Sequence, residues 1–200
     1  MENEIATQMG ARPGAEAIGH PGLPSAVEVR IAHPSDAELA CNIIRRSISE
    51  SCQRDHRDDP RILSRWLGNK SPGTIASWFA SSGNYSLVAG TATEIVGVGL
   101  LTGAGKIALC YVKPELQLTG VGRALLQRME SRAREWQLPF VTIDSTVTAR
   151  DFYLRQGYLE GRSGEVKSGI RAVSLWKYLD GNLTCAPNGQ RPCNCALARQ

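Results

Sequence analysis

Long apolar runs are missing from this chain of 200 residues. None approaches the roughly 20 residues that cross a bilayer as a helix, so a membrane-spanning protein and a membrane partner are not expected. The first residues, MENEIATQMGARPG, lack the basic and apolar segments of a secretory signal. These two absences predict a cytoplasmic protein whose cysteines stay reduced.

Metal and nucleotide motifs are also scarce. Cys185, Cys193 and Cys195 near the C-terminus include a C-x-C pair. No C-x-x-C partner or nearby histidine completes a tetrahedral zinc set, so no metal is expected. The chain has no G-x-x-x-x-G-K-[ST] sequence, which excludes an ordinary P-loop.

Strong charge of either sign is lacking as well. The net charge is only +4, and acidic residues are interleaved with the basic ones. Such a balance suits a polyanionic small ligand but does not call for nucleic acid as a partner. No long basic or acidic segment favours a macromolecular substrate.

The remaining features predict one folded domain with loose ends. Residues 1–25 and 181–200 are rich in small and turn-forming residues without an apolar period, so we expect a flexible leader and a flexible, cysteine-containing tail. Between them, residues 26–180 alternate between helical and strand patterns in the order β-ααα-βββ-α-β-α-ββ. This order predicts a mixed α/β fold around one sheet.

The tripeptide GVG occurs twice in this domain. At Gly97 to Gly99 it lies inside an expected strand and opens no helix, so it does not fit a dinucleotide-binding fingerprint. At Gly120 to Gly122, in QLTGVG, it lies between a strand and a helix expected over residues 121–136. Glycines there would let the unpaired N–H groups of the helix start approach a phosphate. The alternative is that they serve only backbone geometry.

The segment VKPELQLTGVGRALL resembles the acyl-CoA-binding motif of GNAT-type N-acetyltransferases. That motif is a strand ending in valine, a proline, and Q/R-x-x-G-x-G/A at a helix start, matched here by Val112, Pro114, Gln117, Gly120 and Gly122. About thirty residues on, TVTARDFYLRQGY is similar to the A-x-x-F/L-Y-x-x-x-G-F/Y element of the same family.

The resemblance implies a mixed, mostly antiparallel sheet of about six to seven strands with flanking helices. It also implies that two central parallel strands splay apart to hold acetyl-CoA as the acyl donor. The acyl-CoA contacts then fall on Cys110, Tyr111, Val112, Gln117, Leu118, Thr119, Gly120, Val121, Gly122, Arg123, Thr146 and Phe152. Thr146 stands where many relatives have an asparagine.

The resemblance further implies direct attack of an amine on the thioester, with Tyr153 as the acid that protonates the departing sulfur. A packing role for Tyr153 is the alternative. The histone-type branch of the family has a glutamate base at the start of the fourth strand, where this chain has Lys106. Asp144, at the end of the strand FVTID, is a candidate catalytic carboxylate near the thioester, although it could equally cap the following helix. The identity of the general base stays open.

The acceptor is less defined by the sequence. The polar stretch SESCQRDHRDDP holds Asp55 and His56, which could attract a cationic amine and relay its proton, or could belong to a solvated loop. The acceptor amine could be on a small molecule or a protein, and a homodimer is allowed. Two other hypotheses are an acyl-CoA-sensing or partner-binding module without turnover and a toxin that acetylates aminoacyl-tRNA.

Overall fold

The computed structural model describes residues 27–91, 93–161, 166–167 and 169–179. The expected leader and tail, with Cys185, Cys193 and Cys195, lie outside these residues, so their interpretation stays a prediction. Within the described ranges, no helix is long and apolar enough to cross a membrane.

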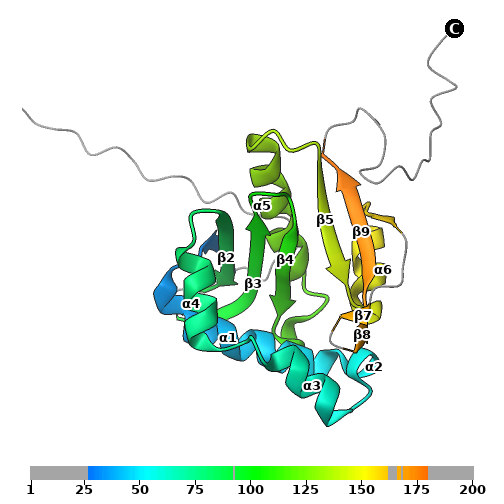
Figure 1. The fold of residues 1–200 in the computed structure, drawn as a ribbon. Helices are drawn as coiled ribbons and strands as arrows, with labels where there is room; N and C mark the ends of the chain where they lie inside the picture. Colours follow the sequence, from blue (N-terminus) through cyan, green and yellow to red (C-terminus); the bar gives the residue numbers. More distant parts are fainter. Residues whose placement is uncertain (1–26, 92, 162–165, 168, 180–200) are drawn as a thin grey trace, which may run out of the picture.

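The strands form two groups that lie side by side (Figure 1). The first group is antiparallel and runs β1 (Glu28–Ile31), β2 (Asn84–Gly90), β3 (Ile95–Thr102) and β4 (Ile107–Val112). The second runs β5 (Phe140–Ser145), β9 (Val173–Tyr178) and β6 (Leu159–Glu160), and a small ribbon pairs β7 (Val166–Lys167) with β8 (Ile170–Arg171). The expected mixed α/β fold is confirmed. The described residues hold somewhat more strands than the six to seven expected. The excess comes from β6, β7 and β8, which are only two residues long each and are too short to show a pattern in the sequence.

β4 and β5 are the parallel strands that join the two groups. They meet at their starts, where Lys106 pairs with Thr142 and the Thr142 N–H donates to the Gly105 carbonyl at 2.9 Å. No further ladder joins them in the part of the chain that the structure describes. The two strands therefore diverge toward their C-terminal ends, as Figure 1 shows.

Helices cover both faces of the sheet. α1 (Ala37–Arg46) and α4 (Pro72–Ala80) pack on one face over a core that includes Ile44 and Ile75, each fully buried. α5 (Val121–Glu135) packs on the other face, where α6 (Val147–Arg155) follows β5. The sequence predicts that Val121, Leu125, Met129, Ala133 and Trp136 share one apolar face of this helix. The first four side chains are fully buried, whereas Trp136, at the C-cap, is only half-buried.

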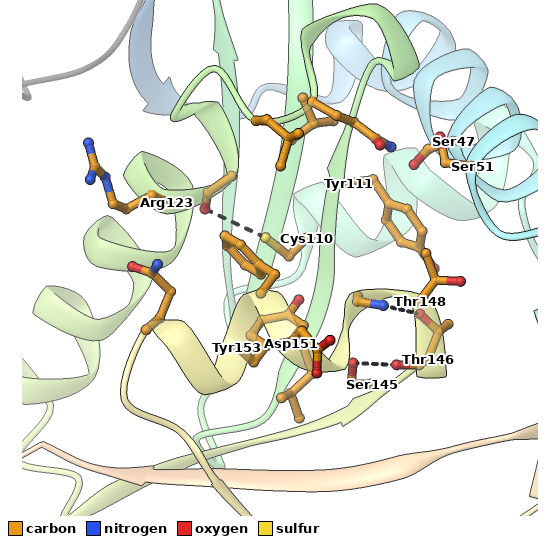
Figure 2. A pocket seen from close by; sticks show the side chains of 18 of the residues that line it. Ser47, Ser51, Cys110, Tyr111, Arg123, Ser145, Thr146, Thr148, Asp151 and Tyr153 are labelled. Carbon is orange, nitrogen blue, oxygen red and sulfur yellow. Dashed lines mark hydrogen bonds between the residues drawn. The ribbon is translucent and has the colours of Figure 1, made fainter.

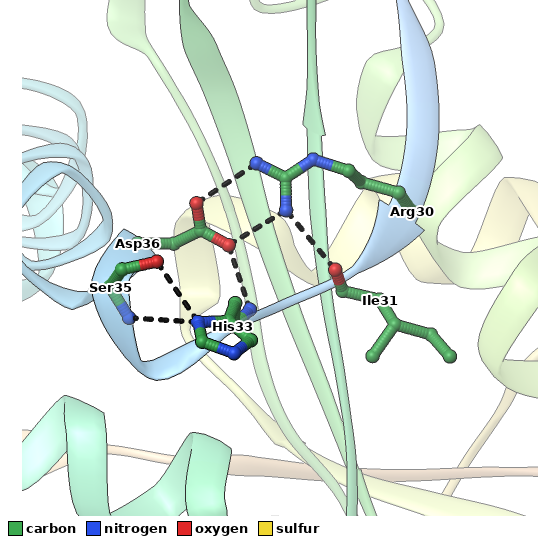
Figure 3. Close-up of polar contacts among 5 residues, drawn as sticks. All are labelled: Arg30, Ile31, His33, Ser35 and Asp36. Atoms are coloured by element: carbon green, nitrogen blue, oxygen red, sulfur yellow. Dashed lines mark hydrogen bonds and ion pairs between the residues drawn. The ribbon is translucent and has the colours of Figure 1, made fainter.

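The segment after β1 begins differently from the sequence expectation. The sequence of this segment predicts a helix capped by Ser35, but a 3-10 turn, η1 (Pro34–Asp36), precedes α1 and is capped by His33. The Asp36 carboxylate accepts hydrogen bonds from the His33 N–H at 2.7 Å and from Arg30 at 2.7 and 2.9 Å (Figure 3). A proline-containing turn is thus held against β1 by a charged side chain.

The region after α1 is more ordered than its polar composition suggested. α1 continues into a π-helical segment, η2 (Ser47–Ser51), which is followed by α2 (Gln53–His56) and α3 (Pro60–Leu67). The expected loop around Asp55 and His56 is therefore a short helix, and both side chains are buried. A second 3-10 turn, η3 (Pro114–Leu116), links β4 to the loop before α5.

Candidate active site

A cavity of about 730 Å³ lies between the diverging ends of β4 and β5 (Figure 2). Its walls come from these two strands, the loop before α5, the first turn of α5, α6 and η2. It is lined by all of the predicted site residues except Val121, Asp55 and His56. Residues far apart in the sequence are thus gathered in the gap that the resemblance implied.

A β-bulge at Ala108 shapes β4 beside this cavity. Leu100 pairs with Leu109 while Leu101 pairs with Ile107, so Ala108 is an extra residue on β4. Ile107 consequently packs in the core under α5, whereas Leu109 packs in the core under α1. Because a bulge bends and twists its strand, it explains why β4 turns away from β5. The bulge could not be predicted from the sequence, since the run KIALCYV shows no alternation that would mark an extra residue.

The start of α5 lies at one end of the cavity without a side-chain cap. Gly120 stands at the N-cap with φ of +92°, a conformation that favours glycine, and provides no capping hydrogen bond. In contrast, Asp59, Ser71 and Thr146 cap α3, α4 and α6 with their side-chain oxygens. The electropositive N–H groups at the start of α5 are therefore left for an anion.

The loop before α5 is compact. The Thr119 hydroxyl donates to the Leu116 carbonyl at 2.6 Å, and Leu118 adopts φ of +63° with its side chain 97% exposed. Gln117, Leu118 and Thr119 all line the cavity. Val121 does not, because its side chain is fully buried against the sheet.

Tyr153 stands near the middle of the cavity on α6. Its side chain is 4% exposed and packs edge-on against Phe152 and Tyr158, with ring centroids 4.9 and 5.5 Å away. Burial raises the pKa of the Tyr153 phenol well above its usual value near 10, and neighbouring Cys110 adds to this effect. The phenol is therefore protonated at neutral pH, as a proton donor must be.

Asp144 lines the floor of the cavity in a fixed position. Its carboxylate accepts a hydrogen bond from Lys106 Nζ at 2.7 Å and one from the Ser174 hydroxyl at 3.2 Å. The cap of α6 is supplied instead by Thr146, whose hydroxyl oxygen accepts from the Ala149 N–H at 3.1 Å. Asp144 is thus paired with the lysine that stands where the histone-type branch has its glutamate.

Asp55 and His56 lie behind the wall of the cavity. Asp55 Oδ1 accepts from the Val147 N–H at 2.8 Å and so ties α2 to the start of α6. His56 is 2% exposed, accepts from the Asp58 N–H on Nδ1 and contacts the Ser49 carbonyl through Nε2 at 3.3 Å. With Nδ1 as an acceptor, the proton belongs on Nε2, where it can reach Ser49. Both side chains have structural partners, and their role toward a substrate stays a prediction.

The wall of the cavity opposite α5 consists of residues that the sequence did not mark as site residues. Ser47 and Ser51 line it from η2, Cys52 follows them, and Thr148 faces them from α6. Figure 2 shows Ser47, Ser51, Tyr111 and Thr148 on one side and Arg123 on the other, with Cys110 and Tyr153 between them. The π-helical turn that presents the serines has no signal in a pattern read at ordinary helical spacing.

Comparison with known proteins agrees with this geometry. A family model described as an acetyltransferase (GNAT) domain matches residues 65–179. The chain belongs to the GNAT family. A search of curated proteins finds no match.

Several solved GNAT structures share the fold. A GCN5-related N-acetyltransferase from Rhodopseudomonas palustris has a TM-score of 0.70 at 22% identity, covering 80% of this chain and 99% of that one. The PaiA N-acetyltransferase from Thermoplasma acidophilum, in complex with coenzyme A, has a TM-score of 0.63 at 16% identity, covering 76% and 99%. YncA from Salmonella typhimurium, with its cofactor acetyl-CoA, has a TM-score of 0.60 at 18% identity, covering 82% and 99%.

Over the described ranges, no group of three or more His, Cys, Asp or Glu side chains is placed to hold a metal ion. Cys185, Cys193 and Cys195 lie outside these ranges.

Proposed function

We propose that this GNAT protein is an N-acetyltransferase that moves the acetyl group of acetyl-CoA to an amine of a small molecule or protein. The observation that carries the proposal is the cavity between β4 and β5, with an uncapped helix start at one end and a buried phenol near its middle. Related folds solved with coenzyme A and with acetyl-CoA support the choice of donor.

The donor would bind along the cavity from α5 toward α6. The N–H groups at the start of α5 would hold its pyrophosphate, and Arg123, which lines the same end, would add positive charge. The backbone of Cys110 to Val112 would pair with the pantetheine arm much as an added strand does, because β5 has moved away from this part of β4. Phe152 and Thr146 would line the arm from α6.

The amine would attack the thioester carbon directly, so the C–N bond forms as the C–S bond breaks. No covalent bond to the protein is needed, and much of the rate enhancement would come from holding both reactants in place. Tyr153 would give its proton to the departing sulfur. The phenolate would recover a proton from solvent once the products leave.

The proton released by the amine also needs an acceptor. We assign this role to Asp144, which Lys106 and Ser174 hold in a fixed orientation at the cavity floor. The acceptor would approach from the wall formed by Ser47, Ser51 and Thr148, away from the end that binds phosphate. In this proposal Asp55 and His56 support that wall from behind.

A screen of amine acceptors with acetyl-CoA tests the proposal. Primary amines, amino sugars, amino acids and peptides would be offered separately, with free thiol release as the readout and mass spectrometry to identify an acetylated product. Thiol release that requires an acceptor supports the proposal. Binding of acetyl-CoA with no acetylated product from any class would favour the alternative of a sensing module.

A further inference from the structure

Six serine and threonine residues line the cavity, and their hydroxyls fall into two groups. The protein itself uses the first group. Ser145 donates to the next residue's carbonyl at 2.9 Å, Thr146 caps α6, and Thr119 donates to the carbonyl three residues earlier at 2.6 Å. In the part of the chain that the structure describes, no hydrogen bond engages the second group, which is Ser47, Ser51 and Thr148. These three hydroxyls are therefore left for a ligand.

The three unengaged hydroxyls share one side of the cavity, which we call the hydroxyl wall. Ser47 and Ser51 come from the π-helical segment η2, and Thr148 faces them from the first turn of α6. Ser47 is 5% exposed, Ser51 is half-buried and Thr148 is exposed, so the wall runs from the interior of the cavity to its mouth. Most buried side-chain hydroxyls have a hydrogen-bond partner, so the unengaged Ser47 hydroxyl indicates a contact with a ligand.

The cations of the cavity lie away from the hydroxyl wall. Arg123 belongs to the first turn of α5 and Arg155 to the last turn of α6. Figure 2 shows Arg123 on the side opposite the wall. Arg46, which precedes the wall in the sequence, is paired with Glu50 at 2.9 Å and with Glu115 at 2.5 Å. Among the described lining residues, the wall therefore has no cation to pair with an acidic group, whose burial without a partner is costly.

Acidic groups lie near the hydroxyl wall instead. Asp144 lines the cavity floor. Asp55 lies behind Cys52, which lines the cavity, and its N–H donates to the Cys52 carbonyl at 2.9 Å. Its Oδ1 accepts from the Val147 N–H, but its buried Oδ2 has no hydrogen-bond partner among the described residues. The negative charge on this side favours a cationic amine and disfavours a carboxylate or phosphate.

We propose that the hydroxyl wall is a subsite for a hydroxylated amine without an acidic group, and that an amino sugar is the chemical class it fits. The inference rests on the proposed function. Each hydroxyl of the wall can both donate and accept a hydrogen bond, as can each hydroxyl of a sugar. Tyr111, which Figure 2 shows on the same side, would offer its half-buried ring to the apolar face of a sugar ring. The wall would position the amine and take no part in the bond changes at the thioester.

Three related amines test the chemical class. Glucosamine combines an amine with hydroxyls, cyclohexylamine keeps a six-membered ring without hydroxyls, and glucosamine 6-phosphate adds an anion. With acetyl-CoA and the full chain, kcat/KM is referred to the unprotonated fraction of each amine. We expect the value for glucosamine to exceed each of the others by at least roughly 10-fold, the scale of lost hydrogen bonds or of an unpaired charge. An equal or higher value for cyclohexylamine or glucosamine 6-phosphate would overturn the inference.

The variant S47A tests the wall itself. Alanine removes the hydroxyl and favours the helix, so the fold should be retained. We expect kcat/KM for glucosamine to fall by roughly 3- to 10-fold, the scale of one lost hydrogen bond, with an unchanged KM for acetyl-CoA. S49A is the matched control with no expected loss, because Ser49 belongs to the same π-helical segment but lines a separate hollow beside α1. An S47A variant as active on glucosamine as S49A would contradict the assignment.

Calorimetry separates this inference from the proposed function. Glucosamine is titrated into the protein saturated with coenzyme A, so that binding is measured without turnover. Binding that S47A weakens and S49A does not, with no acetylated product from any amine, would keep the subsite and remove the acetyltransferase function. Acetylation of other amines with no binding of glucosamine would keep the function and overturn the inference.

Discussion

The tripeptide GVG serves two different purposes in this molecule. In β3, a Cβ on Gly97 would lie 2.9 Å from Val121 Cγ1, closer than side chains normally approach. At the start of α5, a Cβ on Gly122 would meet Phe152 and Val112 only at ordinary contact distances of 3.5 and 3.6 Å, and Gly120 is needed for its φ of +92°. The first copy lets a helix approach a strand, and the second leaves a helix start open.

The two copies also touch each other. The middle residue of the second copy, Val121, fills the space that Gly97 leaves on the sheet. The absence of a side chain at Gly97 therefore lets the first turn of α5 lie close against β3. A structural glycine and a ligand-binding glycine can share one sequence pattern, and only their tertiary neighbours distinguish them.

Among single substitutions in the two GVG copies, G120E should have the largest effect. It places bulk and negative charge at the proposed pyrophosphate site, so acetyl-CoA affinity should fall by at least roughly 100-fold in calorimetry. G120A is the matched control, since it carries the same backbone strain of about 1 kcal/mol without the charge. A G120E variant that binds acetyl-CoA as well as G120A would place the phosphates elsewhere.

Tyr153 lies near the middle of the cavity, beyond the phosphate end formed by the second GVG, and should affect turnover rather than binding. Y153F keeps the ring and removes only the hydroxyl, so we expect kcat to fall by roughly 10²-fold with near-native acetyl-CoA affinity. Steady-state kinetics with the identified acceptor measure both quantities. Loss of acetyl-CoA binding would make the hydroxyl a donor contact, and an unchanged kcat where chemistry limits the rate would remove it as the acid.

Substitution of the first GVG should reduce stability and leave binding intact. In G97A the new methyl group would meet Val121 and Leu125 at 2.9 and 3.0 Å, so their side chains must shift at a cost of about 1–3 kcal/mol. This corresponds to a melting temperature lower by about 2–12 °C, at about 2–4 °C per kcal/mol for a domain of this size. G99A is the control, because its nearest neighbour is the flexible end of Met129 at 3.3 Å, and it should cost less. If G97A abolishes acetyl-CoA binding while its stability is normal, the assignment of packing to the first GVG and ligand binding to the second is wrong.

The smallest expected effect is on stability and concerns η1, a helical turn whose start is capped, in contrast to the uncapped start of α5. The hydrogen bonds from Arg30 and His33 lower the pKa of the Asp36 carboxyl, with the Arg30 bond as the main cause. A lowered pKa in the folded state adds stability above the unfolded pKa near 3.9 and loses it as pH falls. D36N should therefore unfold about 0.5–1 kcal/mol more easily at pH 7, given the partial exposure of the pair.

The difference between D36N and the wild type should shrink between about pH 5 and pH 2 in denaturant titrations, as the wild-type carboxyl becomes protonated. The exposed Asp151, which pairs only with its neighbour Arg150 among the described contacts, supplies the control variant D151N with little expected change. A difference that persists undiminished at pH 2 would show that charge on Asp36 is not the cause.

Much of this architecture could be predicted from local patterns. The buried stripe of α5, the Ser71 cap of α4 and the helix start at Gly120 depend on residues within one or two turns of each other, so their spacing shows them directly. The bulge at Ala108 and the burial of His56 could not, because the bulge depends on the register between β3 and β4 and the burial depends on how α2 packs against α6 and β8 in the folded chain. A polar run with two arginines and three aspartates suggests a solvated loop until tertiary packing buries part of it.

The candidate site also has one half that could be predicted from the sequence and one half that could not. Its donor half consists of one strand, one turn and one helix whose sequence pattern is preserved, and the predicted residues there line the cavity apart from Val121. The wall formed by Ser47, Ser51 and Thr148 joins segments about a hundred residues apart, and serine and threonine occur too widely to mark a site by themselves. This half depends on how η2 faces α6 in the folded protein.

Amide hydrogen exchange of the unmodified protein with and without acetyl-CoA tests the central claim most directly. Peptides that contain Gly120 to Gly122 and Cys110 to Val112 should become protected, because their N–H groups would bind the donor. Peptides that contain Gly97 to Gly99, whose strand is already paired on both sides, should change little. NAD should protect neither region. Protection confined to other segments, or equal protection by NAD, would contradict the assignment of the second GVG as an acyl-CoA site.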